Sequence, residues 1–148
     1  MRLLRVRPRT EAEMRQRLAR KGFGAKVQED VLEEFKRKGL IDDVKFARYY
    51  VTQAVLSKPV GRRALLYKLK GLGVEGQVAS QAVEGGTRDQ DELETAKRLV
   101  AQRLERLKGL EGPVLQRRLF GFLSRRGFSS EVIHRVMRET VHSSTSSE

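Results

Sequence analysis

The chain has no cysteine, no tryptophan and only three prolines among its 148 residues. The absence of cysteine excludes a disulfide framework and a thiolate metal site, and it suits a reducing compartment, so we expect a cytoplasmic protein. No apolar run approaches the roughly 18–20 residues that a membrane-spanning helix needs. The arginine-containing start, residues 1–9, lacks the apolar block of a signal peptide. No glycine-rich stretch ends in Gly-Lys-Ser or Gly-Lys-Thr, which excludes a P-loop.

Acidic residues are scarce relative to basic ones. The sequence has 31 Lys and Arg against 19 Asp and Glu, a formal net charge of +12. Such a surplus favours a polyanionic partner: nucleic acid, an acidic protein face or anionic lipid. Because 39% of the residues are hydrophobic, the chain can bury a core. A basic amphipathic membrane-surface protein is the least supported class, since that core needs the apolar stripes of the helices.

The few prolines and some of the glycines reveal an internal repeat. Fourteen residues after each proline stands a glycine, and the three pairs are Pro8 and Gly22, Pro59 and Gly73, and Pro113 and Gly127. Apolar residues stand four and eight positions before each glycine, and five and nine after it, which is a helical stripe rather than a strand alternation. We predict that each proline opens a helix, that each glycine ends it in a left-handed turn, and that a second helix follows.

Further helical segments precede these predicted hairpins. Residues 42–56 and 89–108 carry apolar stripes, and the second stripe contains Arg103 among its leucines. Residues 1–7 are predicted to form a shorter version of the same element. The sequence therefore predicts an all-α protein of three tandem three-helix repeats, with limits at 1–39, 40–86 and 87–140. The Ser-rich tail, 141–148, is predicted to be disordered.

Catalytic groups have little support in the sequence. His134 lies on a charged predicted helix and His142 in the tail, which favours surface roles for both. Asp42 and Asp43 could hold Mg²⁺, but they begin a predicted helix, where Asp caps free N–H groups. We therefore expect no enzyme activity, no cofactor and no metal.

The basic residues carry the binding hypothesis. One cluster falls on the first helix of each predicted hairpin, and the three clusters together suit an acidic groove or DNA phosphates. The candidate residues are Arg15, Arg17, Arg20, Lys21, Lys58, Arg62, Arg63, Lys68, Lys70, Arg117, Arg118, Arg125 and Arg126. Tyr49, Tyr67 and Phe122 are the aromatic candidates for exposure, where they could stack on bases. Phe23 and Phe128 are expected in the core beside their turns.

Four motifs in order resemble those of the RecX family, and together they cover nearly the whole chain. They are residues 9–23, Gly39-Leu40-Ile41-Asp42-Asp43 with Phe46-Ala47, Gly61 to Val74, and Leu123 to Phe128 with Val132 and Ile133. Family members usually have more residues before the first motif, so we expect a short first helix. The middle motif departs slightly, reading Gly61-Arg62-Arg63-Ala64-Leu65.

The resemblance implies an elongated, curved array of helical repeats that lies in the groove of the RecA–DNA filament. It implies inhibition of RecA ATP hydrolysis, strand exchange and coprotease activity in DNA recombination, repair and the SOS response. We expect a monomer. The alternative is a sequence-independent nucleic-acid-binding protein of helix-turn-helix-like repeats, on single- or double-stranded DNA. The apolar spacing matches that motif only in part, and the second helices lack a base-reading start.

Overall fold

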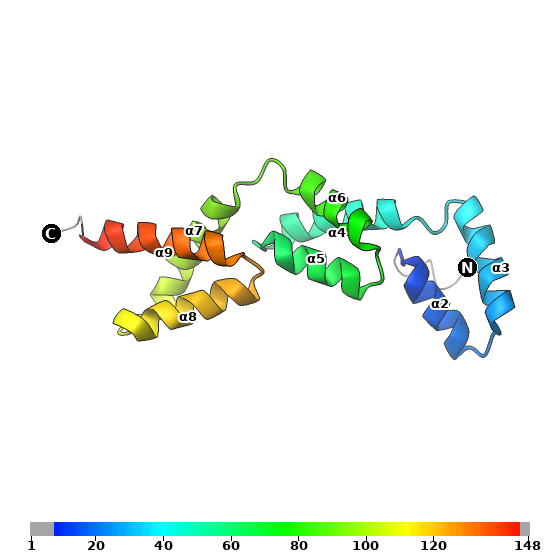
Figure 1. The fold of residues 1–148 in the computed structure, drawn as a ribbon, viewed down its shortest axis with the longest axis horizontal. Helices are drawn as coiled ribbons and strands as arrows, with labels where there is room; N and C mark the ends of the chain where they lie inside the picture. Colours follow the sequence, from blue (N-terminus) through cyan, green and yellow to red (C-terminus); the bar gives the residue numbers. More distant parts are fainter. Residues whose placement is uncertain (1–7, 146–148) are drawn as a thin grey trace. The chain divides into compact units, whose positions relative to one another are not determined.

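The computed structural model describes residues 8–145, and every regular element in that range is an α-helix (Figure 1). The helices are α2 (Glu11–Arg20), α3 (Ala25–Arg37), α4 (Asp43–Ser57), α5 (Arg62–Gly71), α6 (Gly76–Gly86), α7 (Glu92–Arg106), α8 (Gly112–Arg125) and α9 (Ser130–Thr145). The tandem three-helix repeats are confirmed: α4–α6 form the middle repeat, α7–α9 the third, and α2–α3 belong to the first. The predicted helix at residues 1–7 lies outside the described residues.

The chain divides into two compact units. Unit 1 comprises Met1–Gln53 with Leu66–Gly86, and unit 2 comprises Ala54–Leu65 with Thr87–Glu148. In unit 1, α2 and α3 pack as a hairpin on a core of Met14, Leu18, Leu32 and Ile41. In unit 2, α7, α8 and α9 pack against one another (Figure 1). Their shared core is Ala96, Leu99, Val100, Leu119, Leu123, Phe128, Ile133 and Val136.

The glycine turns are where the sequence predicts them. Gly22, Gly73 and Gly127 have φ values of 89°, 88° and 90°, the left-handed conformation that ends each hairpin's first helix. The proline prediction is right only for Pro113, which lies in the first turn of α8. Pro8 and Pro59 instead precede their helices. Thr10 caps α2, which begins at Glu11, and α5 begins at Arg62.

Side-chain caps explain where α4, α7 and α9 begin. Oδ1 of Asp42 accepts hydrogen bonds from the N–H groups of Val44 and Lys45 at 3.1 and 3.2 Å, as predicted for the start of α4. Asp91 caps α7 in the same way. Ser129 caps α9 through the N–H of Val132 at 3.3 Å. These short polar residues satisfy N–H groups that have no partner inside the helix.

The end of the chain differs from the sequence-based expectation. The backbone of α9 continues to Thr145, beyond the predicted boundary at residue 140. No glycine or proline follows Gly127 in the sequence, so nothing in the chain terminates this helix earlier. The prediction of a disordered tail is therefore wrong for residues 141–145, and residues 146–148 lie outside the described part. We retain 1–39, 40–86 and 87–140 as proposed limits of the repeats.

A close joint connects the first repeat to the middle repeat within unit 1. The Thr10 hydroxyl donates a hydrogen bond to the carbonyl of Leu72 at 2.6 Å and accepts one from the N–H of Glu13 at 3.1 Å. The next residue, Gly73, lies so close to Ala12 that a Cβ at Gly73 would be 2.2 Å from the Cβ of Ala12. The glycine turn after α5 therefore packs directly on the start of α2.

An equivalent joint connects the middle repeat to the third within unit 2. The N–H of Gly61 donates to the carbonyl of Arg126 at 2.8 Å, and the N–H of Arg63 donates to the carbonyl of Gly127 at 3.1 Å. A Cβ at Gly127 would lie 2.3 Å from the Cβ of Ala64. Here too, the glycine turn of one repeat packs on the start of the hairpin of the preceding repeat.

Candidate functional site

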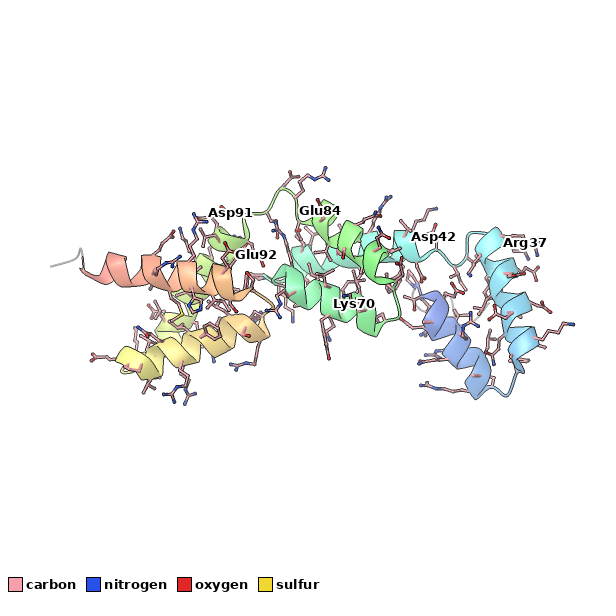
Figure 2. The ribbon with its side chains drawn as sticks, in the orientation of Figure 1. Arg37, Asp42, Lys70, Glu84, Asp91 and Glu92 are labelled. Atoms are coloured by element: carbon pink, nitrogen blue, oxygen red, sulfur yellow. The ribbon has the colours of Figure 1, made fainter. Side chains whose placement is uncertain are left out.

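Four basic side chains line a pocket in unit 1, on the side of α2 that faces the turn after α5. They are Arg9, Arg17, Arg20 and Lys70, and Glu13 is the one acidic residue among them (Figure 2 labels Lys70 on α5). The pocket has a volume of about 350 Å³. Glu13 pairs with Arg9 at 3.4 Å. The excess of positive charge makes this hollow suited to an anion.

The helical period explains how these side chains come together. Glu13, Arg17 and Arg20 stand three to four residues apart on α2, so they share one face of that helix. Lys70 reaches the same pocket from α5 because the joint at Thr10 and Leu72 holds that end of α5 beside α2. Arg17, Arg20 and Lys70 are candidates predicted from the sequence, and the structure brings them together. Arg9 is not among the predicted candidates, but it is buried and lines the same pocket.

A second basic pocket lies in unit 2, between α7 and the end of α8. Arg103 and Arg106 of α7 and Arg126 at the C-cap of α8 line it with Phe122, and its volume is about 320 Å³. The guanidinium carbon of Arg103 lies 4.8 Å from the centre of the Phe122 ring, and that of Arg126 lies 5.3 Å from it. Among the three arginines, only Arg126 is a predicted candidate, and Phe122 is one of the predicted aromatic candidates. Arg103 is not a predicted candidate, although its place within an otherwise apolar stripe of the sequence could have indicated a special role.

Two candidate arginines are engaged inside the fold. Arg15 pairs with Glu29 of α3 and with Glu11, and the hydrogen bond from Arg15 lowers the pKa of Glu29. The same bond to Glu29 raises the pKa of Arg15. Arg62 donates to the hydroxyl of Thr87 at 3.0 Å and pairs with Glu92 at 3.6 Å. Both side chains hold neighbouring elements together, so they are less available to a partner than their sequence positions suggest.

The other candidates are exposed on or beside the predicted helices. These residues are Lys21, Lys58, Arg63, Lys68, Arg117, Arg118 and Arg125. Lys21 is the C-cap of α2, and Lys58 follows α4 rather than lying on α5. The placement of one cluster on the first helix of each hairpin is thus correct apart from Lys21, Lys58 and Arg126.

The aromatic residues partly follow expectation. Tyr49 and Tyr67 are exposed, at 56% and 79%, and Phe128 is buried in the core of unit 2. Phe23 is 46% exposed, so its predicted core position is wrong. The counterpart of Phe23 in the third repeat, Phe128, lies at a joint with the preceding repeat. Phe122 is half-buried beneath two guanidinium groups, and so is less exposed than predicted.

The described residues contain no group of three or more His, Asp and Glu side chains placed to hold a metal ion. Among the same residues, no helix has both the length and the apolar character needed to cross a membrane. His134 is exposed on α9, and its ring lies 5.5 Å from that of Phe120. His142 falls among residues whose side chains are not described.

The repeated helices and joints define a helical repeat protein with arginine-lined pockets. Comparisons with known proteins identify the family within this class. Residues 1–35 match the family description "RecX, first three-helix domain", and residues 89–137 match "RecX, third three-helix domain". A crystal structure of RecX from Lactobacillus salivarius superimposes with a TM-score of 0.81 over 93% of this chain and 89% of that one, at 20% identity, which supports the fold.

Two relatives share more of the sequence. The "Regulatory protein RecX" of Amycolatopsis mediterranei is 37% identical over 137 residues, covering 93% of this chain and 78% of that protein. The one from Mycolicibacterium smegmatis is 38% identical over 144 residues, covering 93% and 74% respectively. The chain belongs to the RecX family.

Proposed function

We propose that this protein binds the RecA–DNA filament and inhibits RecA ATP hydrolysis, strand exchange and coprotease activity, and so regulates DNA recombination and repair. The observation that carries the proposal is membership of a family of regulatory proteins, joined to a strongly basic helical repeat scaffold. A surplus of positive charge attracts the protein to a polyanionic filament over a long range. Such binding needs no catalytic group in the protein.

In this proposal the basic candidates do not contribute equally. Arg17, Arg20 and Lys70 converge on the unit 1 pocket, and the exposed residues of α8 add further positive charge. Arg15 and Arg62 are held in ion pairs, and they serve the fold more than the partner. We also propose that the protein acts as a cytoplasmic monomer without enzyme activity, the ATPase being that of RecA.

The test is RecA-catalysed ATP hydrolysis on single-stranded DNA, with the protein titrated in at two salt concentrations. We expect turnover to fall at well below one molecule per RecA. Weaker inhibition at the higher salt would indicate that exposed charges take part in binding. Unchanged turnover at both salt concentrations would contradict the proposal.

A matched pair of variants tests the pocket. The triple substitution R17Q/R20Q/K70Q removes three positive charges that line it. The control K26Q/R37Q/K45Q removes the same charge from exposed positions of the same unit that do not line the pocket. We expect the first variant to need several times more protein for half-inhibition than the control. Equal loss in both would mean that only net charge matters.

The second candidate function is sequence-independent binding of nucleic acid without RecA. The observation that favours it is the exposed Tyr67 on α5 between the basic residues Arg63 and Lys68, since exposed aromatics beside cations suit single strands. Binding of bare DNA with a steep salt dependence, together with unchanged RecA turnover, would favour this reading.

A further inference from the structure

The pocket between α7 and α8 in unit 2 has features that general surface charge does not explain. Three guanidinium groups, those of Arg103, Arg106 and Arg126, line one hollow, and no acidic side chain lines it with them. The nearby Glu105 is exposed and pairs with Lys108 at 2.9 Å, so its charge does not compensate the pocket. Bringing three like charges together is unfavourable unless an anion binds among them.

Arg103 is unusually constrained for a basic residue. Its Nε is buried and has no hydrogen-bond acceptor among the described residues, while its guanidinium lies over the Phe122 ring. Contact with the ring restricts the planar group, so less conformational freedom is lost when a ligand binds. The buried edge is also shielded from water, which strengthens the attraction of the same group for an anion.

The chemistry of the lining favours phosphate over carboxylate. A carboxylate offers two oxygens in one plane, which one guanidinium fork can saturate. A phosphate group presents oxygens in several directions, so it can accept from forks that approach from α7 and from the end of α8. Gln102 lines the pocket as well and adds a neutral polar group.

We propose that Arg103, Arg106 and Arg126 form a phosphate-binding subsite, and that the phosphate belongs to a nucleic acid strand. The proposal rests on the nucleic-acid contact within the proposed function and gives it a specific location. Phe122 acts as a positioning residue, because it supports Arg103 and Arg126 through its ring. The half-buried position of Phe122 makes it a support for the guanidiniums more than a stacking platform.

The test is fluorescence anisotropy of a labelled oligo-dT with the full chain, measured over a range of salt concentrations. For R103Q we expect roughly tenfold weaker binding, as for a lost hydrogen bond to a charged group. We expect the slope of log K against log salt to fall by roughly 0.7 for one lost phosphate contact. R106Q should behave similarly, and because Arg106 is exposed this substitution leaves the fold intact.

Charge and geometry are separated by a conservative pair. R103K keeps the charge but loses the planar fork, and we expect it to bind nearly as weakly as R103Q. The control is Arg98, an exposed arginine of the same helix that does not line the pocket; R98K should bind like the unmodified protein. If R103K also binds like the unmodified protein, the subsite proposal is wrong and the pocket contributes only charge.

Competition tests both the phosphate and its source. Inorganic phosphate that competes with oligo-dT better than chloride at equal ionic strength would support phosphate recognition, and phosphate that competes no better than chloride would contradict it. A nucleotide such as dTMP that competes as well as oligo-dT at equal phosphate concentration would assign the site to terminal phosphates and contradict the strand proposal. Polyglutamate that competes as well as an oligonucleotide of equal charge would overturn phosphate recognition altogether. If R103Q and R106Q bind oligo-dT normally and still inhibit RecA, the subsite proposal is wrong and the proposed function stands.

Discussion

The carboxylate of Asp43 accepts a hydrogen bond from the backbone N–H of Glu11 at 3.0 Å, although the two residues are 32 positions apart. Asp43 is in the first turn of α4, and Glu11 is the first residue of α2. The same arrangement recurs in unit 2, where the carboxylate of Glu92 accepts from the N–H of Arg62 at 3.3 Å (Figure 2 labels Glu92 at the start of α7). At each joint, an acidic residue of one repeat thus satisfies the free N–H at the start of a helix in the preceding repeat.

Substituting Asp43 should separate its hydrogen bond from its charge. D43A removes the acceptor and should lower the free energy of unfolding by about 0.5–2 kcal/mol, as for other helix caps. D43N keeps an oxygen acceptor and should lose less at pH 7. The measurement is urea unfolding monitored by circular dichroism. A D43N variant as unstable as D43A would show that the charge, and not the acceptor, matters.

The pH dependence of the same residue follows from its burial. Burial raises the pKa of Asp43 above its ordinary value. Because the folded state then binds the proton more tightly than the unfolded state, this group favours folding at low pH and loses that contribution as pH rises through the raised pKa. The stability of the unmodified protein relative to D43N should therefore increase as pH falls from neutral through that range. Thermal unfolding of both proteins across the acidic range checks this, and a difference that stays constant with pH would contradict it.

Two glycines with the same backbone conformation should respond differently to alanine. Gly22 and Gly127 have φ values of 89° and 90°, but a Cβ at Gly22 meets nothing within 4 Å, whereas one at Gly127 would overlap Ala64. G22A should cost only the backbone strain, about 1–2 kcal/mol. G127A should cost clearly more, because the joint must also move apart. Chemical denaturation of the two variants gives the comparison, and equal losses would mean that the joint at Gly127 yields freely.

Thr10 should be a position of high sensitivity for its size. Its side chain is buried and makes two hydrogen bonds, one to cap α2 and one to the carbonyl of Leu72 across the joint. T10V should therefore destabilise the protein by about 1–3 kcal/mol, since it leaves buried polar groups without partners. T10S keeps the hydroxyl and should recover most of that loss in thermal unfolding. A serine variant as unstable as the valine variant would point to methyl packing instead.

Adjacent arginines on α5 should behave as opposites. Arg62 bonds to Thr87 and Glu92, so R62Q should lower the unfolding free energy by about 1 kcal/mol. Arg63 is exposed, and among the described residues its side chain makes no hydrogen bond or ion pair, so R63Q should change stability by less than about 0.5 kcal/mol. The two variants remove the same charge from neighbouring positions. Thermal melts that show equal effects would contradict the structural role of Arg62.

The sequence predicts the hairpins well because their signals are local. A left-handed turn requires glycine, and Gly22, Gly73 and Gly127 mark those turns without knowledge of the rest of the fold. The caps at Thr10 and Asp42 are equally local. Prolines are weaker markers, because their fixed φ suits the residues before a helix as well as its first turn.

The pockets could not be predicted in the same way. Lys70 joins Arg17 only because a joint between two repeats brings α5 to α2, and no spacing within one helix encodes that contact. Arg103 is visible in the sequence as a break in an apolar stripe, but its role depends on Phe122 and Arg126 of another helix. Charge counts likewise cannot tell that Arg15 and Arg62 already have acidic partners inside the fold.

The recurring joint pairs two unlike surfaces, and this makes the assembly of repeats directional. Each joint places a glycine turn and an acidic helix start of the later repeat against the hairpin start of the earlier one. Such head-to-tail contacts do not pair with themselves, so one more repeat inserted between the middle and third repeats can present a matching surface on both sides. Gene duplication or design could therefore lengthen the protein by whole repeats, and each added repeat would form the same two kinds of joint with its neighbours.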